Sequence, residues 1–290
     1  MSTLTADPEV TAPRPADPET AAHSTAVAHS TFAGVMRGEW IKLLSLRSTW
    51  WALVAAAALM TLASLAYAKS LNAMAEDPVT APGIEQMHGA EIVASGFLFG
   101  MLIIAVMGAL FITGEYSTGM VRSTFAAVPT RLPVLAAKTL TLVALTLAVT
   151  AVSLTLSYLV TMAQLARYDL VPALDDPGTW RVLGGAAYCL TAAALFSLGL
   201  GTLLRSTAAT ITVALTVLLL LPGILSFVTL DWVQTIVSYL PLPASSTLLT
   251  TGTTDVPGAT LSTYTSLVVV AAYAVVPIVT AAVLLRRRDA

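Results

Sequence analysis

The sequence predicts an all-α, polytopic membrane protein with six transmembrane helices. Of its 290 residues, 57% are hydrophobic and only 10% are charged, and the mean hydropathy is +0.83. A soluble domain carries about 25% charged residues, so a soluble fold of this chain would expose large apolar patches to water. The chain also contains six apolar segments, each near the ~20 residues that a helix needs to cross ~30 Å of hydrocarbon.

Residues 1–33 precede these segments and are rich in Thr, Ala, Pro and acidic residues. They show no apolar periodicity long enough for a helix, so we expect a disordered cytoplasmic tail. The remaining residues, 34–290, are expected to form one six-helix transmembrane domain.

The segment before the first span is "VMRGEWIKLLSLRSTWW", residues 35–51, and we call it the lead-in. As a helix it would place four apolar residues on one face, Met36, Trp40, Leu43 and Leu44. Gly38, Lys42 and Ser45 would lie opposite, while Glu39 and Arg47 interrupt the pattern. We expect an amphipathic helix in the cytoplasmic interface, with Trp at the boundary. The alternative is an ordinary basic flank of the first span.

The six spans are expected at about 50–68, 92–112, 135–160, 182–204, 208–230 and 265–285. Only "RST", residues 205–207, separates the fourth from the fifth. A single helix there would be too long and would place Arg205 at mid-bilayer, so we predict a tight hairpin. Pro222 and Pro277 each remove a backbone donor and are expected to bend their helices.

The end of the first span allows one other interpretation. "LAYAK", with Ala66 and Ala68 after an apolar run, is similar to a signal-peptidase site. The run is long for a signal sequence and follows a long N-terminal tail, so a membrane span is the favoured interpretation.

The distribution of Lys and Arg predicts how the helices are oriented. With the N-terminus in the cytoplasm, all of the 14 basic residues except Lys69, Arg167 and Arg181 fall on the cytoplasmic side. Short connections rich in Lys and Arg stay in the cytoplasm. We therefore expect both termini and the connection 114–131 to be cytoplasmic, with the chain in the plasma membrane.

Ionisable groups are nearly absent from the predicted spans. No acidic residue and no histidine lies within them, and Lys138 and Arg205 lie at their cytoplasmic ends. Carriers driven by protons or sodium usually have ionisable groups at membrane depth, and a buried serine needs a base to act as a nucleophile. His88 has no second histidine nearby, so we interpret it as a solvated loop residue. We expect no catalytic site, cofactor or metal, and no nucleic-acid partner.

Hydroxyl side chains in the third span, and small residues in the second and fourth spans, recur at the spacing of one helix face. In the third span, one face carries the hydroxyls of Thr146, Thr150, Ser153 and Ser157. This row could line a polar path, or its hydroxyls could bond to their own backbone and to neighbouring helices. Small residues predict close packing at Gly96 and Gly100 of the second span and along a fourth-span row of Gly185, Cys189, Ala193, Ser197 and Gly201.

The chain carries no motif for nucleotide hydrolysis. Its lysines are Lys42, Lys69 and Lys138, and none follows a glycine, so the phosphate loop GxxxxGKS or GxxxxGKT is missing. If the protein moves a substrate against a gradient, a separate ATPase must drive it from the cytoplasmic side. The longest cytoplasmic connection is "GEYSTGMVRSTFAAVPTR", residues 114–131. Its mixture of charged and aromatic residues is typical of protein interfaces.

The lead-in, this connection and "YLPLPASS" before the last span resemble the permease subunits of bacterial type-2 ABC exporters. The resemblance extends over about residues 34–288, and "GEYSTGMVR" is its most specific part. It implies that the lead-in is an elbow helix. It also implies that residues 231–250 are partly helical and dip back into the outer leaflet. The N-terminal tail is longer than the family pattern requires.

The resemblance also implies partners and coupling residues. Residues 114 to about 125 would form a coupling helix in a cleft of the ABC ATPase subunit, and the contact would be made by Glu115, Tyr116, Gly119 and Arg122. Two permeases, either identical or different, would pair around the substrate path. The chain would then be a transport subunit in the lipid bilayer rather than an enzyme.

Other interpretations stay open. The charges of the connection could serve only to fix the topology, with Glu115 capping a helix. The whole chain could be a secondary carrier or channel, which the lack of membrane-buried charge disfavours, or a membrane scaffold without a path. The sequence does not identify a substrate.

Overall fold

The computed structural model describes residues 31–120, 131–251 and 261–287, and all structural statements below concern these residues. Within them every regular element is a helix. Most of the predicted tail and Arg122 lie outside the described residues. The first described helix, α2 (Phe32–Ser45), begins slightly before the predicted domain boundary at residue 34.

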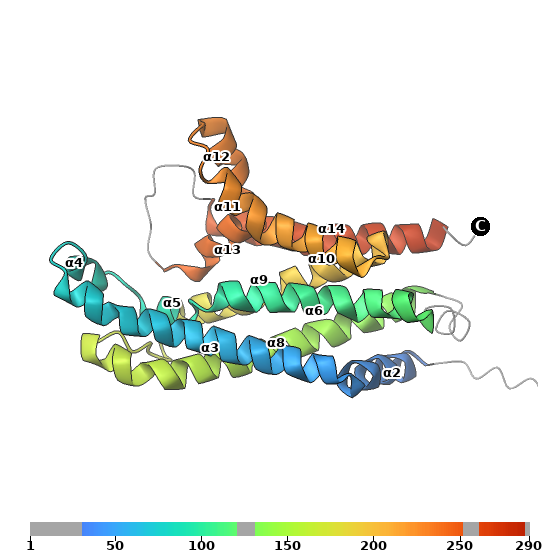
Figure 1. The fold of residues 1–290 in the computed structure, drawn as a ribbon, viewed down its shortest axis with the longest axis horizontal. Helices are drawn as coiled ribbons and strands as arrows, with labels where there is room; N and C mark the ends of the chain where they lie inside the picture. The colour runs from blue at the N-terminus through green and yellow to red at the C-terminus, as the bar shows by residue number, and fades with distance from the viewer. Residues whose placement is uncertain (1–30, 121–130, 252–260, 288–290) are drawn as a thin grey trace, which may run out of the picture.

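Six helical segments are long and apolar enough to cross a membrane, as predicted. They are α3 (Arg47–Glu76), α6 (Phe97–Thr118), α8 (Arg131–Leu165), α9 (Pro177–Leu204), the run from α10 to α11 (Thr207–Leu225) and α14 (Thr263–Arg287). They lie along the long axis of the molecule (Figure 1). Lipid offers no hydrogen-bond partners to the backbone, and a helix pairs its backbone N–H and C=O groups within itself. The chain is therefore a multi-pass membrane protein.

The bounds of these helices correct two expectations. The first span does not end near residue 68, because α3 continues through the residues that are similar to a peptidase site and ends at Glu76. The second span begins later than predicted, at Phe97, because residues Gly89–Val93 form a separate short helix, α5. A further short helix, α4 (Ala81–Ile84), lies in the same connection.

The turn between the fourth and fifth spans is as tight as predicted. α9 ends at Leu204, and Arg205 adopts a left-handed conformation with φ of 54°. Ser206 then caps α10 (Thr207–Leu215). The Arg205 guanidinium lies 5.5 Å from the centre of the Tyr116 ring, so it sits beside the last turn of α6 rather than inside a long helix.

The fifth span is shorter than the predicted 208–230. After α10 the helix widens into a π-turn over Thr216–Leu220 and resumes as α11 (Leu221–Leu225). Pro222 is the second residue after the π-turn, and a proline there lacks a backbone N–H and would clash with the preceding turn. The wider turn accommodates this ring, which is the local distortion that the proline predicted.

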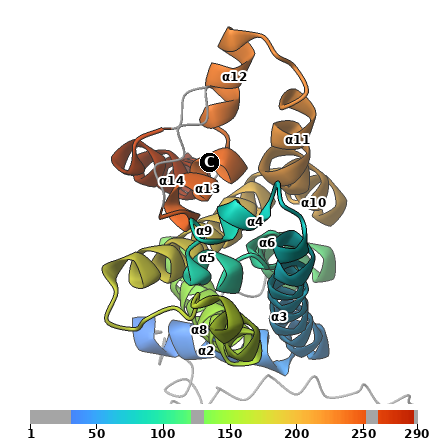
Figure 2. The ribbon, with the colours of Figure 1, turned by 90° about the vertical axis from the view of Figure 1, so that its left-hand side faces the viewer.

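Two short helices follow the fifth span, α12 (Asp231–Ser238) and α13 (Pro241–Leu249). The partly helical structure expected for residues 231–250 is therefore confirmed. α12 lies apart from the six-helix bundle, whereas α13 returns to pack against α14 and α9 (Figures 1 and 2).

α9 lies at the centre of the bundle, between α14 and the pair α6 and α8 (Figure 2). The predicted small-residue rows are confirmed as packing faces. A Cβ atom added to Gly185 would lie 2.6 Å from the carbonyl oxygen of Leu248, and one added to Gly201 would overlap Ile112. At Gly96 it would overlap the backbone of Met60. At Gly185 and Gly96 a side chain is excluded because the backbones approach closely, and at Gly201 because neighbouring side chains fill the space.

Candidate functional site: a buried charge cluster at the basic end

Four charged side chains meet where α2, α6 and α8 come together, and we call them the charge cluster. They are Glu39 and Lys42 of α2, Glu115 of α6 and Lys138 of α8. The Lys138 Nζ atom lies 2.5 Å from Glu39 Oε2 and 3.0 Å from Glu115 Oε1. Lys42 Nζ lies 2.8 Å from Glu39 Oε1 and 3.1 Å from Glu115 Oε1. Each lysine thus donates to both carboxylates.

The charge cluster is largely closed to solvent. The side chains of Lys138 and Glu39 are 1% and 2% exposed, and that of Glu115 is 12% exposed. Removing an ion from water costs several kcal/mol, which is offset only when the charge is paired and its hydrogen bonds are made. Two lysines facing two glutamates meet this requirement, because the formal charges cancel. The Lys138 ammonium also lies 4.1 Å from the centre of the Phe111 ring, a cation–π contact.

The pairing shifts the pKa values of Glu39 and Lys42, the two members of the charge cluster on α2. Burial acts to raise the pKa of Glu39, but the charges and hydrogen bonds of Lys138 and Lys42 outweigh it, so this pKa lies below its ordinary value. Burial likewise acts to lower the pKa of Lys42, but Glu39 and Glu115 outweigh it and raise this pKa. Both residues are therefore charged at neutral pH.

The local positions of these residues explain why the cluster forms. Glu115 lies in the last turns of α6, where the helix dipole disfavours a negative charge. The two lysines offset this effect. Glu39 and Lys42 are three residues apart on α2 and so share a helix face. Lys138 lies in the second turn of α8, at the same end of the bundle.

Sequence reasoning missed the cluster and assigned other roles to its members. Lys138 was expected only to fix the orientation, and Glu39 only to interrupt an amphipathic pattern. The lead-in is helical up to Ser45, with Leu43 and Glu39 buried and Trp40 37% exposed. Its expected position in the membrane interface stays a prediction. A signal was available: a glutamate beside a membrane span needs a countercharge, and Lys42 and Lys138 are the lysines at that end of the bundle.

The predicted coupling residues take different positions in the structure. Glu115 is turned into the charge cluster, and Tyr116 is half-buried beneath Arg205. Gly119 is exposed and ends α6 in a left-handed conformation with φ of 73°, which favours glycine. Arg122 lies outside the described residues. The structure thus brings Glu115 together with α2 and α8, and the contact of these residues with an ATPase stays a prediction.

The predicted hydroxyl row lies inside the single chain. Thr146, Thr150, Ser153 and Ser157 are fully buried, on the helix α8 that packs against α3 and α9. Ser153 donates to the Val149 carbonyl at 2.7 Å, as one interpretation expected. The hydroxyls of Thr146, Thr150 and Ser157 have no hydrogen-bond partner among the described residues. A role in a substrate path stays a prediction.

His88 is not the solvated loop residue that the sequence suggested. Its Nδ1 accepts a hydrogen bond from the Ala90 N–H at 3.2 Å and so caps α5. Its Nε2 lies 2.8 Å from Asp176 Oδ2, so in the neutral imidazole Nε2 is the atom that donates. Hydrogen bonds from the backbone N–H groups of Gly178 and Thr179, together with His88, lower the pKa of Asp176. This contact ties α5 to the start of α9, and α5 lies away from the end of the bundle where α2 carries the charge cluster (Figure 1).

Comparison with known proteins adds no family assignment. No protein-family model matches the chain, and no curated protein is significantly similar to it. Its class therefore rests on its own structure, which is that of an all-helical, multi-pass membrane protein.

Proposed function

We propose that this chain is the transmembrane permease subunit of an ATP-driven exporter in the plasma membrane. A separate ABC ATPase subunit would bind at the connection 114–131 and supply the energy. The resemblance of "GEYSTGMVR" and the lead-in to type-2 ABC exporters suggested this function. The observation that supports it most strongly is the charge cluster, which links the first residues of that connection to two other helices.

The charge cluster gives a physical route for mechanical coupling. Glu115 lies where α6 meets the connection and is bound to Lys42 of α2 and Lys138 of α8. Removing one partner of a buried ion pair costs about 3–5 kcal/mol, so the three helix ends resist separation. A force applied to the connection would move α2 and α8 together with α6. ATP-driven closure of the ATPase pair would in this way change which side of the path between two permeases is open.

The distribution of charge supports an external energy source. In the described parts of the spans, the charged residues lie towards the helix ends, at Arg47, Lys69, Glu115, Lys138 and Arg181, for example. Proton- or sodium-driven carriers usually need ionisable groups at membrane depth. The cytoplasmic location of both termini, of the connection and of an interfacial α2 is part of this proposal.

Copurification tests the proposal. The chain, tagged at its C-terminus, is extracted from its native membrane, and proteins with a phosphate loop are identified by mass spectrometry. We expect one ATPase to copurify with the wild type and to be lost in Arg122→Glu, while Arg167→Glu, at the opposite end of the bundle, retains it. Full retention in Arg122→Glu would remove the assigned contact. Concentrative transport by the purified chain alone in vesicles would overturn the proposed function.

A further inference from the structure

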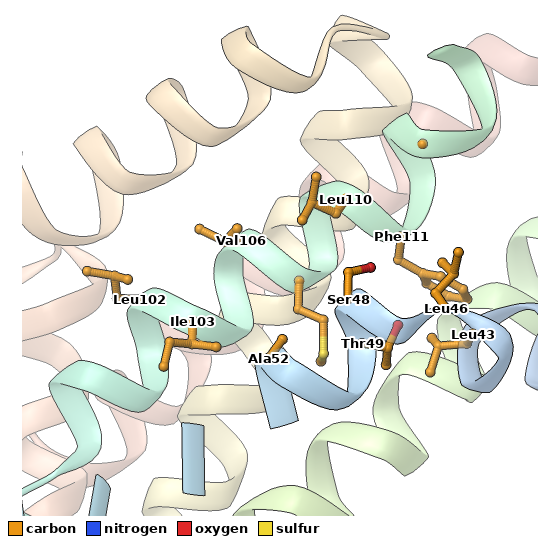
Figure 3. A pocket seen from close by; sticks show the side chains of 12 residues that line it. Leu43, Leu46, Ser48, Thr49, Ala52, Leu102, Ile103, Val106, Leu110 and Phe111 are labelled. Atoms are coloured by element: carbon orange, nitrogen blue, oxygen red, sulfur yellow. The ribbon is translucent and has the colours of Figure 1, made fainter. Parts of the chain in front are cut away.

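The surface of the bundle has hollows of different chemistry at its two ends. An apolar groove of about 370 Å³ lies between α3 and α6 beside Phe111, and no charged side chain of the described residues lines it (Figure 3). A polar hollow of about 210 Å³ lies towards the opposite end, between α5 and the connection from α8 to α9. Its lining includes His88, Asp169 and Asp176. The polar hollow therefore brings a histidine together with two carboxylates.

α5 is only five residues long, yet it binds three distant parts of the chain. Ser64 of α3 donates to the last carbonyl of α5 at 2.8 Å. The Glu91 carboxylate of α5 accepts from the N–H and the hydroxyl of Thr251, just beyond α13, at 2.6 and 2.9 Å. Gly89 packs so closely against the Leu170 carbonyl that a Cβ atom would overlap it. α5 therefore joins α3, α13 and the α8–α9 connection.

His88 adds a fourth link, and its two ring nitrogens have fixed roles. Nδ1 lies 3.2 Å from the backbone nitrogen of Ala90. An amide N–H can only donate, so Nδ1 must accept and carries no proton. Nε2 then carries the proton and donates to Asp176 Oδ2 at 2.8 Å. Capping α5 and binding α9 at the same time therefore requires a neutral imidazole.

A second proton on the ring would break one of these contacts and keep the other. An imidazolium donates from both nitrogens, so its Nδ1–H would face the N–H of Ala90 and the cap would be lost. The contact with Asp176 would remain as an ion pair, because hydrogen bonds from the N–H groups of Gly178 and Thr179 favour the charged carboxylate. The His88 side chain is 28% exposed, so protons can reach it from water.

Carboxylates make up the other charged groups of the hollow, namely Asp169 and Asp176. Glu91 of α5 is bound to Thr251. The remaining charged residues at this end are exposed, and among the described residues none of them forms a hydrogen bond or ion pair with His88. They are Lys69, Glu76 and Asp77 at the end of α3, Glu85 after α4, Arg167 and Asp175 between α8 and α9, and Arg181 of α9.

We propose that His88 is a pH-operated latch on α5. Its neutral ring caps α5 and ties it to α9, whereas its protonated ring stays on Asp176 and releases the first turn of α5. Imidazole is the side chain whose charge ordinarily changes between about pH 5 and 8. Because α5 also holds α3 and α13, its release loosens the links among these helices. The latch does not depend on the proposed transport function.

Hydrogen exchange of the full chain in detergent, followed by mass spectrometry, tests the proposal. Exchange in residues 89–93 is measured between about pH 5 and 8, and each rate is divided by the intrinsic rate of an unfolded chain at the same pH. We expect the corrected rate to be about fivefold higher at the acidic end, as the loss of one helix cap implies. Residues 178–181 of α9, which Asp176 caps, are the internal control and should not change.

Two variants separate the latch from other effects of pH. His88→Asn keeps an acceptor for the cap but does not titrate, so its corrected rate should be the same throughout. Asp176→Asn keeps an oxygen that caps α9 but removes the charge that binds the imidazolium, so the rise should move to lower pH.

Three results would overturn the latch. They are no rise in the wild type, an equal rise in His88→Asn, and a rise at unchanged pH in Asp176→Asn. If His88→Asn misfolds, as judged by circular dichroism, His88→Ser takes its place, because serine also caps helices without titrating in this range.

Discussion

Lys138 and Glu39 lie 99 residues apart in the sequence, yet their Nζ and Oε2 atoms are 2.5 Å apart in a site that is almost closed to solvent. Their contact joins α8 to α2, and Glu115 extends it to α6. The cluster therefore fixes α2 relative to the end of α6 and the start of α8, the two helices that the connection 114–131 joins. Its energetic and functional roles can be separated by substitution.

Removing Lys138 should strongly destabilise the protein. Among the described residues, Lys138→Met leaves Lys42 as the countercharge of Glu39 and Glu115. Breaking a buried pair in this way costs about 3–5 kcal/mol. Thermal unfolding in detergent, followed by circular dichroism, measures the effect. Lys69→Met, at an exposed position near the other end of α3, is the control and should change stability little.

The double variant Glu39→Gln/Lys138→Met refines this test. It removes one charge of each sign, so the cluster stays neutral, and its destabilisation should be clearly smaller than the sum of the two single effects. If Lys138→Met were as stable as Lys69→Met, the cluster would have no structural role.

The cluster should also make stability depend on pH. The folded state lowers the pKa of Glu39 below the ordinary value of 4.5, so more protons bind in the unfolded state. The contribution of Glu39 is present above pH 4.5 and is lost as the pH falls through the lower, folded pKa. The melting temperature of the wild type should therefore fall in acid below pH 4.5 more steeply than that of Glu39→Gln. Parallel curves for the two proteins would contradict this assignment.

The pKa of Lys42 is raised from 10.5, so its contribution to stability depends on pH in the opposite direction to that of Glu39. Its stabilising contribution is fully present below pH 10.5 and is lost as the pH rises through the higher, folded pKa. Lys42→Gln should therefore be less stable than the wild type near neutrality. The difference in melting temperature between the wild type and Lys42→Gln should become smaller in strongly alkaline solution.

The end of α6 provides a matched pair of glycine substitutions. Gly119 has φ of 73°, and a Cβ there would meet nothing within 4 Å, so Gly119→Ala should cost about 1–2 kcal/mol through backbone strain alone. Gly114 also has open space, but it lies within α6, where Gly114→Ala should stabilise by about 1 kcal/mol. Thermal unfolding distinguishes these opposite signs. Gly119→Asn should be tolerated better than Gly119→Ala.

Adjacent glycines of α9 test the packing faces. A Cβ at Gly185 would lie 2.6 Å from the Leu248 carbonyl oxygen, whereas one at Gly184 would meet nothing within 4 Å. Gly185→Ala must push α13 away from α9 and should destabilise by about 1–3 kcal/mol. Gly184→Ala should be neutral or stabilising. Similar melting temperatures for the two variants would show that α9 and α13 do not pack as described.

The sequence by itself determined the membrane class, the number of long apolar helices, the hairpin at residues 205–207 and the packing faces at Gly96, Gly185 and Gly201. These features are local: a stretch of about 20 apolar residues must form a helix in lipid, because its backbone polar groups have no other partner there. Small residues at every fourth position likewise share a face by helix geometry alone.

Only the tertiary structure decided which charges meet and where grooves remain. In the lead-in pattern Glu39 only interrupts an amphipathic face, but the structure buries it, because Lys138 of a distant helix supplies its countercharge. The groove beside Phe111 depends in the same way on the separation of α3 from α6. A buried ion is stable only beside its partner, and that partner is fixed by how the helices pack, not by the residues next to it in the chain.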